Sequence, residues 1–324
     1  MAFDFSLVTA PFRMQPGLRR VAPGCAQLTA NRVGDRHLRE KLAVLGSAPT
    51  QALCAVATFD ETLALVAIAA ESARLGLAAF HVERTPAGTV LCEAPLLGWS
   101  TDGERVVGDG DAAIGAVLGA LPAHLRRAAL VSLAFAEDFA VLDATTATVP
   151  WLAVCLPSHW APEDKVGRAF AAVHAPVADG ELLRAASASL AALVTGAERW
   201  ERFVWTITAD SRLHQHPARS SVAWPGPLGG DAQEDREALV ALASLRSERQ
   251  TFLPIPGARQ AVFTILVDSL PLAQAVVAAE DARRLHDALA SMSPPVLAYR
   301  RLDRARDRLL GWLAARGDGA ASAQ

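Results

Sequence analysis

The spacing of apolar residues along the chain predicts a mixture of helices and strands. Phe59, Leu63, Val66 and Ala70 recur at intervals of three and four residues, which is typical of an amphipathic helix over residues 58–75. By the same criteria helices are expected at residues 36–45, 58–75, 111–121, 162–170, 181–193, 234–249, 280–292 and 302–316. Strands are expected at residues 80–94 (a hairpin), 128–144, 151–156, 202–208 and 260–268.

These elements do not alternate strictly between strand and helix, so a parallel, doubly wound sheet is disfavoured. The pattern favours an α+β fold in which helices flank an antiparallel sheet. No internal repeat or linker interrupts the chain, so we expect a single domain over residues 1–324. Residues 1–30 are expected to be extended, residues 209–233 to form a polar loop, and residues 317–324 to fray.

Composition narrows the classes of protein that the chain can belong to. Of the 324 residues, 52% are hydrophobic and the net charge is −3, which excludes a disordered chain and a general nucleic-acid binder. Cys25, Cys54, Cys92 and Cys155 form no C-x-x-C pair and are expected to stay reduced. The start lacks a signal-peptide pattern, and the apolar runs of about nine residues fall short of the roughly 20 that a membrane span needs. We therefore expect a soluble, cytoplasmic protein.

Four short segments combine charged or imidazole side chains with apolar, strand-like neighbours. They are residues 136–138, 156–177, 202–205 and 245–251. Buried charge is costly unless it is paired or binds a ligand, so these segments are candidates for a functional site.

The order of these segments resembles the haem-dependent oxidative N-demethylase family. The matching motifs are ED, PS-x-W…K-x-G…H-x-PV, R-x-x-W and LR-x-ERQT, preceded by PF-x-M-x-x-GL at residues 11–18 and followed by the close at residues 299–302. The resemblance implies a PAS-like, haem b-containing subunit of a bacterial monooxygenase-type oxidoreductase. Such a subunit uses O2 to remove a methyl group from a small secondary amine, with electrons from partner flavin and iron–sulphur subunits.

The chain also departs from the family's pattern. Val204 stands where the family usually has Asn, Ala136 where it often has Gln, Ala178 where it has Pro, and residues 265–268 where an Arg-Thr-Tyr run is common. The lost amide and guanidinium remove possible contacts to a substrate or an anion. A divergent, non-catalytic PAS-like module that binds a ligand or a partner therefore stays open as the alternative.

His174 is the candidate metal ligand. Pro176 holds the segment in an extended, non-helical form, and a neutral imidazole nitrogen binds haem iron well. The alternative is a hydrogen-bonded core histidine.

Five further charged residues are candidates for contacts to the haem or the substrate: three cations and two carboxylates. Arg249 is the clearest of the cations. Arg249 continues the apolar stripe of the helix expected at residues 234–249 and needs an anion, either a haem propionate or a structural partner at Glu137, Asp138 or Glu201. Lys165 and Arg202 are further propionate candidates, with a solvated surface and strand packing as their alternatives.

Glu137 and Asp138 are the candidate catalytic carboxylates. Period-two alternation would place one on each face of a strand, where it could orient a protonated amine or deliver a proton to bound O2. The alternative is a salt bridge. The triplet His214-Gln215-His216 lacks a third ligand nearby and is interpreted as the surface of a loop.

Overall fold

The computed structural model describes residues 3–86, 88–173, 178–181, 186–220, 222–227 and 231–318. Its centre is a seven-stranded sheet in the order β1-β9-β10-β11-β7-β8-β2, in which every pair of neighbours is antiparallel. The strands are β1 (Arg19–Arg20), β2 (Leu53–Ala55), β7 (Asp138–Asp143), β8 (Thr148–Ala153), β9 (Trp200–Thr208), β10 (Ser244–Ile255) and β11 (Gln260–Pro271). The predicted antiparallel α+β class is confirmed.

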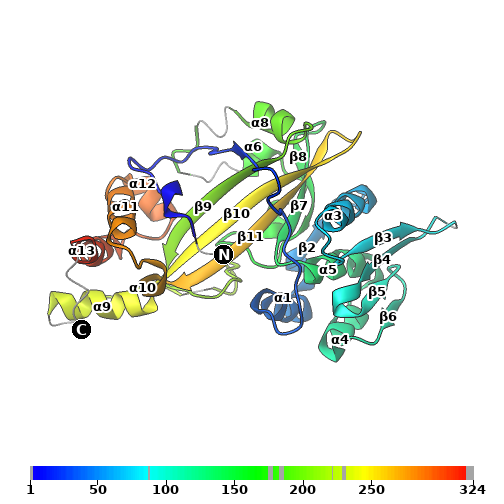
Figure 1. Cartoon of the computed structure of the whole chain (residues 1–324), viewed down its shortest axis with the longest axis horizontal. Coiled ribbons are helices and arrows are strands. Elements are labelled where there is room, and N and C mark those ends of the chain that lie inside the picture. The colour runs from blue at the N-terminus through cyan, green and yellow to red at the C-terminus, as the bar shows by residue number, and fades with distance from the viewer. Residues whose placement is uncertain are drawn as a thin grey trace.

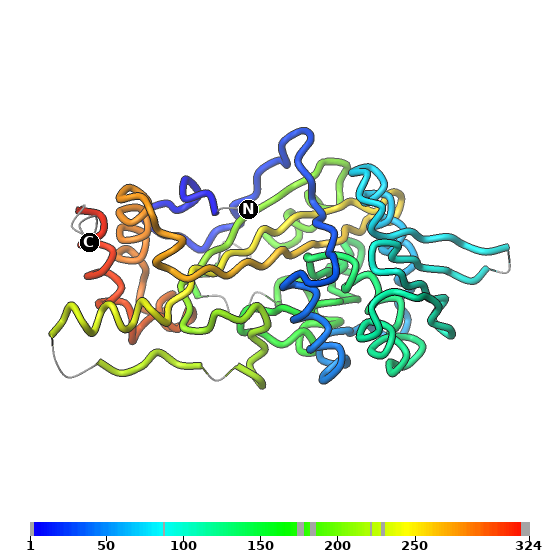
Figure 2. Tube along the Cα trace, turned by 60° about the horizontal axis from the view of Figure 1, so that its bottom comes forward, coloured from blue at the N-terminus to red at the C-terminus, as the bar shows by residue number. Residues whose placement is uncertain are grey.

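A second, smaller sheet projects from one end of the molecule (Figures 1 and 2). It runs in the order β3-β4-β5-β6, with β3 (His81–Arg84), β4 (Val90–Ala94), β5 (Trp99–Thr101) and β6 (Val106–Gly108). Strands β3 and β4 form the hairpin expected at residues 80–94.

Helices gather at the two ends of the large sheet (Figure 1). At the end beside the small sheet lie α1 (Arg36–Ser47), α2 (Pro49–Ala52), α3 (Thr62–Arg74), α4 (Ala112–Ala120) and α5 (Ala123–Ala134). At the opposite end lie α9 (Ala232–Leu242), α10 (Leu272–Ala275), α11 (Ala279–Ala290), α12 (Pro294–Tyr299) and α13 (Arg306–Gly317). Short helices α6 (Phe170–Val173) and α8 (Ser187–Val194) pack on the sheet itself, and the 3₁₀ turns are η1 (Phe5–Leu7), η2 (Pro95–Leu97) and η3 (Pro162–Asp164).

Two buried clusters correspond to these two ends. The larger one joins the small sheet and helices α1, α3, α4 and α5 to the large sheet through Phe135, Phe139 and Trp151. The second packs the C-terminal helices on Trp205 and Ile207 of β9. Burying apolar surface contributes roughly 25 cal/mol per Å², so these clusters are the main source of stability at each end.

Two element predictions were wrong because local composition and tertiary pairing opposed the expected period. The strand expected at residues 128–144 is helix α5 followed by β7. The Ala- and Leu-rich run favours a helix, and Asn31 accommodates its end by donating Nδ2 to the carbonyls of Leu133 (3.0 Å) and Phe135 (2.7 Å). The helix expected at residues 234–249 ends at Leu242, after which β10 pairs along both of its edges with β9 and β11.

Helix boundaries changed at two other places. The helix expected at residues 162–170 is only the turn η3, because Gly167 adopts a φ of 73° that cannot continue a right-handed helix. The helix expected at residues 58–75 begins at Thr62, where Asp60 Oδ1 accepts the Thr62 backbone N–H at 2.9 Å.

A buried ion pair ties α1 to the start of β7. Lys41 has no exposed surface, and its Nζ donates to the carbonyls of Ser132 (3.1 Å), Phe135 (3.0 Å) and Glu137 (2.6 Å). The same Nζ lies 3.1 Å from Asp138 Oδ1. Asp138 Oδ2 in turn accepts the backbone N–H of Leu156 at 2.7 Å. The pair therefore joins three segments that are far apart in the sequence.

Replacing Lys41 by Met should lower the free energy of unfolding by about 3–5 kcal/mol, because Asp138 is left as an uncompensated buried charge. Denaturant unfolding of the purified protein measures the change. The double variant Lys41→Met/Asp138→Asn should recover part of the loss, since Asn keeps an acceptor for Leu156 N–H. Equal stability of wild type and Lys41→Met would show that the pair contributes nothing.

Candidate functional site

Strand pairing sorts the residues of β9, β10 and β11 onto two faces of the large sheet. Directly paired residues in an antiparallel ladder point to the same side, and successive residues alternate. Arg202 pairs with Gln250, which pairs on its other side with Ile265. The next row on the same side consists of Val204, Glu248 and Val267. We call the side that carries these two rows the site face.

An apolar row adjoins these polar rows on the site face. It consists of Trp200, Phe252, Phe263, Ala140 and Leu152, which pair in that order across five strands. The rings of Phe252 and Phe263 stack with centroids 4.9 Å apart. Side chains from α6, α8 and the segment around Trp160 pack against this row. On the site face, the apolar row through Phe252 therefore lies directly beside the row that contains Gln250 and Arg202.

Glu248 is the centre of a hydrogen-bonded chain on the site face. Gln250 Nε2 donates to Glu248 Oε2 at 2.6 Å, and the hydroxyl of Ser158 donates to Oε1. Arg246, which is 1% exposed, donates from Nε to Ser158 Oγ at 2.7 Å. Its other donors go to the carbonyls of Leu156, Arg212 and Leu213. Burial lowers the pKa of Arg246 to about 10, so the guanidinium stays charged at neutral pH and supports the Glu248 carboxylate.

Arg202 is a half-buried cation in the row beside Glu248. Burial lowers the pKa of its guanidinium, and the charge of Glu248 opposes that shift. Within the part of the chain that the structure describes, no hydrogen bond or ion pair engages it. Its five N–H donors are therefore available to a planar anion.

Arg249 lies on the opposite face, and its predicted position on a helical stripe was wrong. It is in the middle of β10, where the four-residue step from Leu245 fits strand alternation as well as a helix. Arg249 Nε and Nη2 both bond Glu201 Oε2, at 3.0 and 2.9 Å. Glu201 also accepts Arg19 Nε at 2.9 Å. The structural pair with Glu201, one of the two alternatives, is therefore confirmed.

Comparison with models of protein families identifies the family of this chain. Residues 122–310 match the family model of the haem-dependent oxidative N-demethylase, alpha subunit-like proteins. The match covers more than half of the chain and includes the site face, Ser158 and Arg249. The chain belongs to this family. No curated protein matches it.

His174 falls within the matched region of this N-demethylase-like chain but lies outside the described residues. Lys165 is half-buried and close to that segment, since its Nζ donates to the carbonyl of Val173 at 3.4 Å. Burial, reinforced by the charge of Arg168, lowers the pKa of Lys165. Lys165 and Arg202 therefore stay candidates for holding an anionic group.

Glu137 and Asp138 do not both lie in a strand, as the predicted alternation requires. Glu137 precedes β7, and both side chains are buried, at 2% and 0% exposure. Glu137 Oε2 accepts the backbone N–H of Thr29 at 2.9 Å, and Asp138 is held by Lys41 and Leu156 N–H. The salt-bridge alternative therefore holds for Asp138, which pairs with Lys41 of α1, whereas Glu137 binds a backbone N–H of the N-terminal segment.

Gln215 and His216 of the histidine triplet are buried and His214 is half-buried, so the interpretation of the triplet as a loop surface was wrong. Gln215 and His216 are 0% and 2% exposed. His214 Nδ1 bonds the carbonyl of Cys155 at 2.7 Å, and His216 Nε2 bonds Glu163 at 3.0 Å. No group of three possible metal ligands occurs in the described ranges. The same ranges contain no helix that could span a membrane.

Sequence reasoning missed Glu248 and Arg246 as site residues, because the helix assigned to residues 234–249 turned Glu248 away. Period-two spacing along residues 245–251 would have placed both on one face. Two departures from the family's pattern, Val204 and Ile265, lie in the same rows and make them more apolar.

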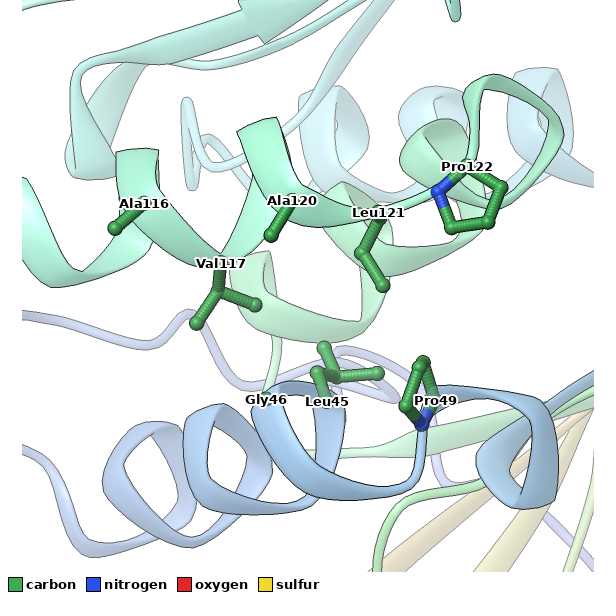
Figure 3. A pocket seen from close by; sticks show the side chains of 8 residues that line it. All are labelled: Leu45, Gly46, Pro49, Ala116, Val117, Ala120, Leu121 and Pro122. Carbon is green, nitrogen blue, oxygen red and sulfur yellow. The ribbon is translucent and has the colours of Figure 1, made fainter.

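A separate groove of about 290 Å³ lies between α1 and α4 (Figure 3). Leu45 and Val117 extend into it from opposite helices, and no ionisable side chain lines it. It therefore lacks the groups that acid–base or redox chemistry would need.

Stability should fall with pH because of Glu137. Burial raises the pKa of this carboxyl from 4.5 to about 7, so the folded protein binds the proton more tightly than the unfolded chain. The resulting stabilisation is fully present below pH 4.5 and is lost as the pH rises through 7. The loss is on the order of 3 kcal/mol at most.

Denaturant unfolding of wild type and Glu137→Gln between pH 5 and 8 tests this dependence. The variant keeps an acceptor for Thr29 N–H but has no proton to lose, so its curve should be flatter. Identical slopes for the two proteins would assign the titration to another group.

Proposed function

We propose that this chain is the haem-binding subunit of an oxidative N-demethylase that acts on a small secondary amine. It would use O2 and electrons from partner flavin and iron–sulphur subunits, and it would work in the cytoplasm. Family membership supports the general chemistry. The observation that carries the proposal for this chain is the site face, where a half-buried, available guanidinium adjoins an apolar row.

The donor set of the site face fits a haem. A porphyrin needs apolar contact for its faces and cations for its propionates. The row around Phe252 and Phe263 offers the first, and Arg202 and Lys165 are the candidate cations for the second. We assign His174 as the iron ligand from its motif. Arg249 is not assigned to a propionate, because its donors are already held by Glu201.

A bound haem would supply the activation of O2 and the one-electron chemistry. The chain's own task is to hold the amine. Glu248 accepts hydrogen bonds from Ser158 and Gln250 and is half-buried, so its carboxyl group can accept a further N–H. We assign it to bind the protonated amine, in place of Glu137 and Asp138, which are buried inside the fold. Val204 and Ile265 would contact the methyl groups.

A non-catalytic ligand- or partner-binding module is the second candidate. The observation that favours it is the replacement of polar family residues by Val204 and Ile265 in the two rows that contain Arg202 and Glu248. Such a module would bind its ligand on the site face without catalysing a reaction.

Haem titration tests the proposed cofactor. Wild-type protein should develop a Soret band at one haem per chain, and His174→Ala should lose or shift it. Arg202→Gln should bind haem about tenfold or more weakly, the value of one charge-assisted hydrogen bond. Arg249→Gln is the matched control on the same sheet; it should lose stability but bind haem as the wild type does.

The absence of a Soret band after titration of the wild type would exclude the demethylase and leave the binding module. Equal weakening by Arg202→Gln and Arg249→Gln would exclude a propionate contact at Arg202.

Replacing Glu248 by Gln tests the amine site separately from the haem. The variant should keep its Soret band, while amine-induced spectral change should require about 10- to 100-fold more dimethylamine, because a charged hydrogen bond is lost. The exposed Glu234→Gln is the control and should behave as the wild type. An unchanged amine titration of Glu248→Gln would contradict the assignment.

A further inference from the structure

A cavity lined by ionisable side chains lies where the end of β9 meets the junction of α12 and α13. Its volume is about 230 Å³. The polar and aromatic groups that line it are His159, Thr208, Trp224, Arg300, Arg301, Asp303 and Arg304. None of these residues is assigned to the haem or the amine in the proposed function.

Charge in this cavity is unbalanced. Three guanidinium groups line it, and Asp303 is the one carboxylate among its lining residues. The chain as a whole has a net charge of −3, so the excess of positive charge is local rather than a general basic character. Arg301 and Arg304 are exposed, and within the described ranges their side chains form no ion pair. A cavity with one sign of charge concentrates ligands of the other sign.

Two buried nitrogen atoms of residues that line the cavity also lack partners among the residues that the structure describes. They are His159 Nδ1 and Arg300 Nε. The rest of the Arg300 guanidinium is fixed, since Nη1 donates to the carbonyl of Trp205 and the group stacks 4.5 Å from the centroid of Phe12. Buried polar atoms without a partner are rare in folded proteins, and a bound ligand or water is one explanation for them.

The backbone holds these groups in an uncommon conformation. His159 and Arg301 are non-glycine residues with φ angles of 60° and 57°. The backbone N–H of His159 donates a hydrogen bond to the carbonyl of Gln215 at 2.9 Å. The carbonyl of Arg301 accepts a hydrogen bond from Trp224 Nε1 at 2.7 Å. Such left-handed residues cost of order 1 kcal/mol or more and cluster at binding sites.

We propose that this cavity binds a small oxyanion, a phosphate or carboxylate group, between the exposed Arg301 and Arg304 and the buried nitrogens of His159 and Arg300. Burial and the neighbouring arginines lower the pKa of His159 to about 4, so at neutral pH its ring is uncharged and donates one N–H. Arg300 stays charged, because burial lowers the pKa of its guanidinium only to about 10. The site therefore offers charged donors at its mouth and fixed donors at its wall.

Calorimetric titration of the full-length protein with inorganic phosphate, and separately with succinate, tests the site at constant ionic strength. At least one of the two should bind saturably, and the arm that binds identifies the phosphate or the carboxylate as the source. Arg304→Gln and Arg301→Gly should each weaken binding about tenfold, the effect of one charged hydrogen bond. Gly also suits the φ of 57° at position 301.

Arg105→Gln is the matched control, since Arg105 is an exposed arginine that lies outside the cavity and pairs with Asp102. It should bind the anion as the wild type does. Circular dichroism verifies that each variant folds, and the exposed Arg304 allows a decision even if Arg301→Gly does not fold.

Absence of saturable binding for both anions would overturn the proposal, as would equal binding by wild type, Arg304→Gln and Arg301→Gly. His174→Ala should bind the anion as the wild type does. If haem binding fails, the anion titration therefore still decides whether the cavity binds an anion.

Discussion

The pairing of β10 along both of its edges is the constraint on which the site depends. Twelve residues of β10 are matched to β11 and nine of these also to β9, so the register of the central strands leaves no freedom to slip. A shift by one residue would exchange the two faces of the sheet. This ladder separates neighbours in the sequence: Glu248 and Gln250 reach the site face, while Arg249 and Thr251 reach the opposite face.

The alternating residues of β10 therefore have different roles on the two faces of the sheet. On the opposite face, Arg249 and Glu201 join β10 and β9, and the hydroxyls of Thr251 and Thr264 lie 2.7 Å apart between β10 and β11. On the site face, Glu248 is held by neutral donors while the charge of Arg246 lies one hydrogen bond further away. Because the structural pairs lie behind the sheet, Arg202 and Glu248 remain available in front of it.

The two carboxylates at residues 137 and 138 illustrate how buried charge joins distant segments. Asp138 is ion-paired with Lys41 of α1, and Glu137 binds the backbone before α1. Both are in the matched family region, whereas Lys41 and Thr29 precede it. The N-terminal part of the chain thus completes the core of the region that carries the site.

The sequence by itself determined the α+β class, the hairpin at residues 80–94, the strands around residues 202–208 and 260–268, and the family, because these depend on local period and on motif order. It could not decide which charged residues face the site. Helical spacing and strand alternation both explain Leu245 and Arg249, and only pairing with β9 and β11 distinguishes them. Likewise, the burial of His216 and Gln215 and the cavity at His159 and Arg301 arise from segments far apart in the chain. Tertiary contacts alone bring such segments together, since no local pattern records which distant backbone or charge will lie opposite.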